Sequence, residues 1–394
     1  MSTAQATGRG GLRVPDAVRD RFSEIVSQLT AAGALIVVFI YLSFASPYFL
    51  SAGNLFNVGV QSSVIALVAV GETLVILTAG IDLSVGSVAA LSGVLGVMAM
   101  SQGGLPVFVG VLVGVAVGAV AGLVNGLLVS RGQLAPFIAT LGMFGVARGL
   151  AFIVSGAVAV YGAPDNFRLV GEGEIGPVPL PIIYLVIVAV LGHLVLTRTR
   201  LGRYSYAMGS NEDAARFSGI PVRLYQMYVY IICGALAGFG GMILSSRVHS
   251  GQPNSAIGLE LDVIAAAVIG GASLFGGQGT VAGTLIGAFL IGLIRNGSVL
   301  LNITQYYQQV IIGVIIWLAV YWDQLRRRRL SAGAQTMRKE DKDADVETAG
   351  DNGGGTSGAG DTDHHAGAGL RDREVASGED RAGAGADHPS RGRP

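Results

Sequence analysis

The sequence has few of the residues that soluble enzymes use for chemistry. Its single cysteine, Cys233, excludes an intrachain disulfide framework. Its only lysines are Lys339 and Lys342, near the C-terminus, so no glycine-rich segment carries the lysine that a phosphate-binding loop requires. Charged residues make up only 13% of the chain, and no metal-ligand spacing is present. We therefore predict no ATP site, no metal site, no cofactor and no enzymatic activity in this polypeptide.

Long apolar segments are what the chain has in abundance. It is 51% hydrophobic and contains 60 glycines, a residue more frequent in membrane helices than in soluble ones. About 20 apolar residues are needed to cross a bilayer as a helix. Ten candidate spans cover residues 30–46, 57–79, 83–101, 105–129, 135–155, 180–197, 225–247, 259–275, 279–296 and 306–323. The fold class predicted is an all-α integral membrane protein with about ten transmembrane helices.

The arginines give the orientation of these spans. They cluster before the first span, in the loop 197–224 and after the last span. Ten crossings that start inside place every cluster in the cytoplasm, as the positive-inside rule requires. Both termini are therefore predicted to be cytoplasmic.

Three regions follow from composition. Residues 1–29 form a cytoplasmic N-terminal segment, and residues 30–325 form the transmembrane domain. Residues 326–394 are a basic stop followed by an acidic tail, in which the last 64 residues hold 13 acidic and 8 basic side chains and no aromatic one. Such a tail cannot bury enough apolar surface to offset its ordering entropy, so it is predicted to be disordered.

Glycines recur in two different patterns. Every fourth residue from Gly110 to Gly126 is glycine, and Gly279, Gly283 and Gly287 repeat this spacing. Such stripes let another helix approach closely, and we favour packing within one subunit over a subunit interface. The other pattern predicts possible helix breaks, at residues 79–82 and at Gly270, Gly271, Gly276 and Gly277. Short cytoplasmic turns explain these two places equally well.

Ionisable residues in apolar segments are costly and usually mark function. The candidates are Glu72, Asp82, Arg148, Glu260, Asp262 and Arg295. Glu72 lies deepest and is the candidate for a translocation path. Asp82, followed by Ser84, is expected to cap the next helix rather than to contact a substrate. A chain of carboxylates can also relay protons, which leaves a proton-coupled carrier as a rival interpretation.

The loop after the sixth span contains a short predicted helix. Ser210 or Asn211 can cap its start, acidic residues suit its first turn, and Gly219 ends it. A capped helix between two spans indicates a surface that docks onto another protein. A helix lying on the membrane surface is the alternative.

Four segments resemble permease subunits of the ribose/xylose-type ABC sugar importers. They are GETLVILTAGIDLSVGSVAALSG (71–93), GRYSYAMGSNEDAARFSGIPV (202–222), LELDVIAAAVIGGASLFGGQGTVAGTLIGAFLIG (259–292) and YYQQVIIGVIIWLAVYWDQLRRR (306–328). With the spans between them they cover roughly residues 30–328, in the family's order and spacing.

The resemblance implies partners and a membrane. The implied protein partners are a second permease copy, an extracytoplasmic sugar-binding protein, and an ATP-binding subunit with two nucleotide-binding halves that binds and hydrolyses the ATP. The implied membrane is the lipid bilayer of the cytoplasmic (inner) membrane of a bacterium, and no nucleic acid is expected to bind. The family's coupling segment corresponds to Asn211, Glu212, Ala214, Ala215, Arg216 and Gly219. The implied cargo is a monosaccharide, a pentose such as ribose or xylose. Another small solute such as a nucleoside, or proton-driven transport, remains open.

Overall fold

The computed structural model describes residues 16–318, 320–321 and 324–325. The chain divides into two units, residues 1–331 and 332–394, and the description below concerns the first unit. The predicted basic stop and disordered acidic tail, residues 326–394, and the start of the N-terminal segment lie outside the described residues.

The described part of the chain is almost entirely helical. The long helices are α1 (Asp16–Ala45), α2 (Ala52–Leu77), α3 (Val85–Ser101), α4 (Val107–Ser130), α5 (Pro136–Ser155), α7 (Leu180–Arg198), α10 (Val222–Arg247) and α12 (Val281–Leu300). Shorter elements are η1 (Asp165–Phe167), α6 (Arg168–Glu172), α8 (Arg200–Ser210), α9 (Glu212–Phe217) and α11 (Leu259–Ile269). Strands β1 (Glu174–Ile175) and β2 (Val178–Pro179) pair antiparallel, and residues 305–318 are helical.

The all-α membrane architecture is confirmed, whereas the count of ten spans is not. Seven described helices are long and apolar enough to cross a bilayer, namely α1, α2, α4, α5, α7, α10 and α12. The predicted span at 83–101 is a 17-residue helix, α3. The span predicted at 259–275 is too long, because α11 ends after 11 residues at Ile269. Gly271, with a φ of +96°, then turns the chain out of the helix.

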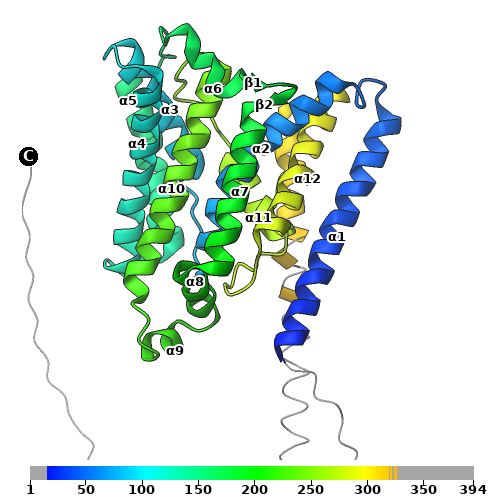
Figure 1. Cartoon of the computed structure of the whole chain (residues 1–394), viewed down its shortest axis with the longest axis vertical. Helices are drawn as coiled ribbons and strands as arrows, with labels where there is room; N and C mark the ends of the chain where they lie inside the picture. The colour runs from blue at the N-terminus through cyan, green and yellow to red at the C-terminus, as the bar shows by residue number, and fades with distance from the viewer. Residues whose placement is uncertain (1–15, 319, 322–323, 326–394) are drawn as a thin grey trace, which may run out of the picture. The chain divides into compact units, whose positions relative to one another are not determined.

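Helices α2 and α10 form the centre of the bundle. Helix α2 is apolar on every side, and from Ser62 to its end every residue is buried, as expected for a helix enclosed by others. It contacts α7, α11 and α12, while α10 contacts α2, α3 and α4 (Figure 1). Helix α1 packs at the edge, against α12.

Both glycine stripes pack within the chain, as predicted, although Gly279 precedes α12 and only Gly283 and Gly287 of the second stripe lie on that helix. A Cβ atom on Gly118 of α4 would overlap the carbonyl oxygen of Gly234 on α10. In the second stripe, a Cβ atom on Gly283 of α12 would overlap the carbonyl oxygen of Gly270 at the end of α11. The missing side chains therefore let neighbouring backbones touch.

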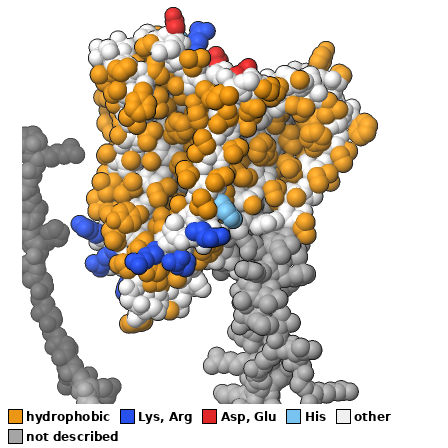
Figure 2. All heavy atoms as spheres, viewed as in Figure 1, with side chains coloured by type: hydrophobic (Ala, Val, Ile, Leu, Met, Phe, Trp, Pro, Cys, Tyr) orange, Lys and Arg blue, Asp and Glu red, His pale blue; other side chains and the backbone are white. Residues whose placement is uncertain are grey.

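Charged side chains gather at the two ends of the bundle. Figure 2 shows arginines at the end formed by α8 and α9, acidic residues together with a basic side chain at the opposite end, and apolar side chains over the flank between them. The exposed arginines at the first end are Arg131, Arg198, Arg200, Arg203, Arg216 and Arg223, and the exposed acids at the other are Asp165, Glu172 and Glu174. An apolar flank between polar ends matches a protein that crosses a bilayer.

Candidate functional site

The first predicted break lies between α2 and α3, and its polar residues Asp82 and Ser84 are buried. Helix α2 ends at Leu77, Ala79 takes a φ of +60°, and α3 starts at Val85. Asn125 of α4 hydrogen-bonds Ser84, and α4 continues to Ser130, so the break lies about 8 Å inside the end of α4. Irregular backbone at this depth is tolerated where protein buries it.

The Glu72 side chain stabilises the break by binding a backbone group within it. Its Oε1 atom accepts a hydrogen bond of 3.0 Å from the Asp82 N–H, and its Oε2 atom accepts one of 3.6 Å from the Cys233 thiol. The Glu72 side chain is fully buried. Its two oxygens are therefore engaged inside the chain, across the turn that joins α2 to α3.

Asp82 organises the start of α3. Its Oδ1 atom accepts hydrogen bonds from the Ser84 N–H at 2.9 Å and from the Ser84 hydroxyl at 2.6 Å. The Asn125 amide donates to both Asp82 oxygens at 3.4 Å and to the Ser84 hydroxyl at 3.0 Å. The structure thus brings Glu72, Asp82 and Ser84 together. Ser84, and not Asp82, is the N-cap residue of α3, and Asp82 bonds to Ser84 rather than to an N–H group inside the helix.

Three further residues of this cluster escaped the sequence analysis as site residues. Asn125 comes from α4, and Tyr230 and Cys233 come from α10. A Cβ atom on Gly80 would lie 2.6 Å from the Tyr230 hydroxyl, so the ring closes directly over the break. The sequence did offer one signal, because Asn125 is a lone amide in an otherwise apolar span. In the structure, Asn125 is fully buried.

The second predicted break contacts the first. Residues 270–280 connect α11 to α12, and Gly276 and Gly277 have φ values of +85° and +74°. The Gly277 N–H donates a 3.0 Å hydrogen bond to the carbonyl oxygen of Leu77, the last residue of α2. Two glycine-rich turns that lie about 200 residues apart therefore meet at the end of α2.

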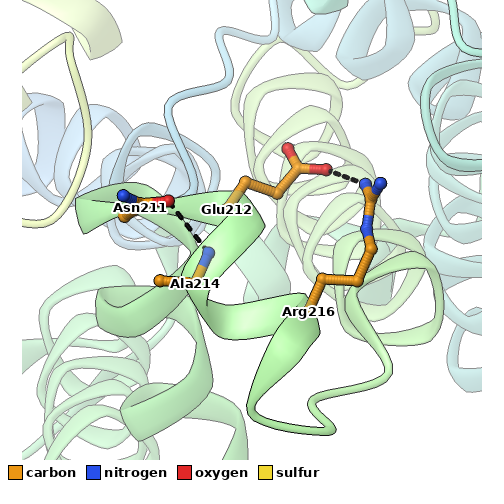
Figure 3. Close-up of polar contacts among 4 residues, drawn as sticks. All are labelled: Asn211, Glu212, Ala214 and Arg216. Atoms are coloured by element: carbon orange, nitrogen blue, oxygen red, sulfur yellow. Dashed lines mark hydrogen bonds and ion pairs between the residues drawn. The ribbon is translucent and has the colours of Figure 1, made fainter. Parts of the chain in front are cut away.

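The predicted coupling segment forms a pair of short helices, α8 and α9, at the arginine-rich end. Asn211 separates them and caps α9, because its Oδ1 atom accepts a 2.9 Å hydrogen bond from the Ala214 N–H (Figure 3). Glu212 pairs with Arg216 one turn later at 2.6 Å (Figure 3). Gly219, at a φ of +82°, turns the chain towards α10. The helix is as the sequence predicts, and of the two cap candidates, Ser210 and Asn211, the structure uses Asn211.

Replacing the Asn211 cap tests how independently α9 folds. Asn211→Ala removes the side chain that satisfies the Ala214 N–H, and loss of such a cap costs about 1 kcal/mol. We expect faster amide hydrogen exchange in residues 212–217 and unchanged exchange in α10. Asn211→Ser keeps a capping oxygen and serves as the control. Equal exchange in the Ala and Ser variants would contradict the capping role.

Ala215 is not part of the exposed surface of α9. It is 4% exposed and packs with Met208 of α8 and Val222 of α10. A bulky charged side chain at Ala215 would disrupt the packing of α9 against α8 and α10. Such a variant therefore could not show whether a partner protein docks on α9. Phe217 is 90% exposed, although it is aromatic, and it is the side chain of α9 that a partner would meet.

Gly209 joins α8 to both breaks. A Cβ atom on Gly209 would overlap the Leu77 carbonyl oxygen and lie 2.5 Å from the Gly277 nitrogen. A Cβ atom on Gly276 would lie 2.8 Å from the Gly209 Cα. Beside this contact, the Tyr206 hydroxyl donates a 2.7 Å hydrogen bond to the Gly279 carbonyl. We call the backbone contact of Leu77, Gly209, Gly276 and Gly277 the glycine junction.

Two other charged groups in apolar segments bind partners within the chain, since Arg148 binds the loop between α10 and α11 and Asp262 binds α12. The Arg148 guanidinium donates to the carbonyl oxygens of Pro253 at 2.7 Å and Ser255 at 2.8 Å. Asp262 forms an ion pair of 2.6 Å with Arg295 of α12. These groups are paired within the chain, which is what charge in a low-dielectric region requires.

Comparison with known proteins assigns the family. Residues 54–320 match the family described as branched-chain amino acid transport system, permease component. The chain is 45% identical over 300 residues to the ribose import permease protein RbsC of Escherichia coli (strain K12), covering 75% of this chain and 92% of that protein. It is 42% identical over 308 residues to RbsC of Bacillus subtilis (strain 168), covering 78% and 95%.

A third relative has a different named cargo. The D-allose transport system permease protein AlsC of Escherichia coli (strain K12) is 41% identical over 290 residues, covering 74% of this chain and 89% of that protein. No solved structure matches the chain. The family match covers more than half of the chain, and the relatives align over most of their length. The chain belongs to this family of multi-pass membrane permeases, as its four sequence segments predict.

Proposed function

We propose that this chain is the permease subunit of an ATP-binding-cassette importer that moves a monosaccharide into the cytoplasm, with a pentose such as ribose as the first candidate. The observation that carries the proposal is a capped, exposed helix, α9, on a bundle whose relatives include the ribose and D-allose permeases. Sequence identity above 40% over about 300 residues supports a shared cargo class. Xylose has no support beyond the resemblance.

The proposed partners are those that the family resemblance implies, and the two ends of the bundle give each its place in the proposal. An ATP-binding subunit with two nucleotide-binding halves would bind α9, at the arginine-rich end, which the positive-inside rule assigns to the cytoplasm. A sugar-binding protein would deliver its cargo to the opposite end, beside α6, β1 and β2 (Figure 1). A second copy of the chain would complete the path. Both termini then lie in the cytoplasm of a bacterial cell, whose inner membrane the chain spans.

The glycine junction gives this transporter a route for coupling. We propose that ATP binding by the partner displaces α9 and α8, and that Gly209 passes the movement to Leu77 and to Gly276 and Gly277. Leu77 ends α2, so the movement reaches the break held by Glu72 and Asp82. Gly270 and Gly271 form the other end of the turn between α11 and α12. Backbone contact without intervening side chains transmits a displacement with little loss, since packed interiors are not continuously deformable.

Glu72, Asp82 and Ser84 act in this proposal as the hinge of the path and not as ligands of the solute. Their polar atoms bind one another, the break backbone, Asn125 and Cys233. A proton relay would need at least one carboxylate open to water or to a donor chain. The enclosed pair therefore favours the ATP-driven importer over the proton-coupled carrier.

Isolation from the native membrane tests the proposal. The tagged chain is purified in mild detergent, and the proteins that accompany it are identified by mass spectrometry. We expect an ATPase with two nucleotide-binding halves. The associated sugar-binding protein is then screened with ribose, allose, arabinose, xylose and nucleosides. A preparation without any ATPase that is nevertheless active in proton-loaded vesicles would contradict the proposal and support the carrier.

Phe217 provides a sharper test of docking than Ala215. Phe217→Ala removes an exposed aromatic side chain of α9 without touching the Asn211 cap, the Glu212–Arg216 pair or the buried Ala215. Because exposed aromatic residues dominate many interfaces, we expect the ATPase subunit to bind about tenfold more weakly. Phe108→Ala, at an exposed position on α4, is the control. Unchanged ATPase binding by Phe217→Ala would show that the partner docks elsewhere.

A further inference from the structure

A groove beside α9 combines arginine with an apolar wall. Its volume is about 500 Å³, within the usual range for small-molecule sites. Three arginines from separate parts of the chain line it, Arg131 after α4, Arg216 in α9 and Arg223 in the first turn of α10. Ile220, Leu224 and Met227 contribute to its apolar wall.

The charge of the groove is only partly neutralised within the chain. Arg216 pairs with Glu212 at 2.6 Å. Arg131 and Arg223 are exposed and form no ion pair with any residue in the described ranges. The groove therefore presents two guanidinium groups in excess, each able to bind phosphate oxygens through two parallel hydrogen bonds.

The position of the groove indicates what kind of phosphate compound it binds. Arg131 directly follows the last residue of α4, and Arg223 is the second residue of α10, so both stand where a spanning helix leaves the bilayer. We propose that this groove binds the headgroup of an anionic phospholipid. The phosphate lies between Arg131 and Arg223, and the first acyl methylenes lie along Ile220, Leu224 and Met227. Basic pockets between spanning helices are suited to such headgroups.

This arrangement would give the lipid contact with the coupling segment. Arg216 belongs to α9, and Ile220 follows the Gly219 turn, so an occupied groove touches the segment between α9 and α10 as well as the end of α4. The lipid would hold α9 against the bundle. Binding does not depend on the nature of the cargo, so the inference stands apart from the proposed function.

Native mass spectrometry of the full-length protein tests the inference. The protein is reconstituted in nanodiscs of phosphatidylcholine alone or mixed with phosphatidylglycerol, released into mild detergent, and the retained lipids are counted. Wild type is expected to retain phosphatidylglycerol in excess of its share of the mixture. Each basic residue near a membrane surface contributes about 1 kcal/mol, so the double variant Arg131→Gln/Arg223→Gln should bind it about 30-fold more weakly.

Two control variants separate the groove from general charge. Arg198→Gln removes an exposed arginine at the same end that does not line the groove, and its retention should equal that of wild type. Arg131→Lys/Arg223→Lys keeps the charge and should retain most of the binding. Undiminished retention in the glutamine double variant would overturn the proposal, as would an equal loss in Arg198→Gln. If the double variant keeps its lipid and loses the ATPase subunit, the groove instead receives an acidic protein surface, and the proposal is wrong.

Discussion

Gly209→Ala is expected to uncouple ATP hydrolysis from uptake while the ATPase subunit stays bound. The added methyl group meets the Leu77 carbonyl oxygen and the Gly277 nitrogen, which are backbone atoms and cannot rotate away. Overpacking of this kind costs about 1–3 kcal/mol, so α8 must move away from α2 and the junction opens. We expect the amount of solute carried per ATP hydrolysed to fall about tenfold or more in proteoliposomes.

Matched variants show whether the glycine junction carries this effect. Gly145→Ala makes the same chemical change in α5, where a Cβ atom meets nothing within 4 Å, and should behave as wild type. Tyr206→Phe removes the hydrogen bond to the Gly279 carbonyl without adding bulk. It should lower the amount of solute carried per ATP hydrolysed less than Gly209→Ala does. If Gly209→Ala keeps the wild-type ratio, movement does not pass through the junction. If it loses the partner altogether, Gly209 only shapes the docking surface.

Glu72→Ala is expected to give the largest loss of stability, and Glu72→Gln to give almost none. Alanine leaves the Asp82 N–H without its acceptor in a fully buried position, which costs about 1–3 kcal/mol, and the cavity adds to this. Glutamine retains an oxygen for the same N–H. We expect a clearly lower Tm and poor yield for the alanine variant, measured by thermal unfolding in detergent.

The same pair of variants decides between a hinge and a proton relay. If Glu72 only holds the break, Glu72→Gln supports uptake at near the wild-type rate, because the bond to Asp82 remains. If Glu72 carries protons, the glutamine variant folds normally and transports nothing, since an amide cannot titrate. A stable but inactive Glu72→Gln variant would therefore contradict the hinge.

Local structure was largely predictable from the sequence. The cap of α9 and the Gly219 turn obey rules that involve only neighbouring residues. The sequence therefore narrowed the cap to Ser210 or Asn211 and identified Gly219. The two glycine stripes were likewise readable, because every fourth residue of a helix shares a face. Glu72 and Asp82 stood out as ionisable groups in apolar segments.

Contacts between distant segments were not predictable. Nothing in the sequence around Gly209 indicates a close contact. The fold alone brings Gly209 against Leu77 and Gly277. Asn125, Tyr230 and Cys233 come from two other helices, so their approach to the break depends on how α4 and α10 pack. Ala215 was interpreted as part of the docking surface, whereas its neighbours in α8 and α10 bury it. The length of the span predicted at 259–275 was not predictable either, because α11 ends at Ile269.

Uptake by proteoliposomes tests the central proposal most directly. The chain is reconstituted with its co-purified ATPase, and radiolabelled ribose is supplied with the sugar-binding protein, once with ATP inside and no proton gradient, and once with a proton gradient and no ATP. We predict accumulation of ribose only in the vesicles that contain ATP. Accumulation of ribose driven by the proton gradient alone, in vesicles without ATP, would contradict the account.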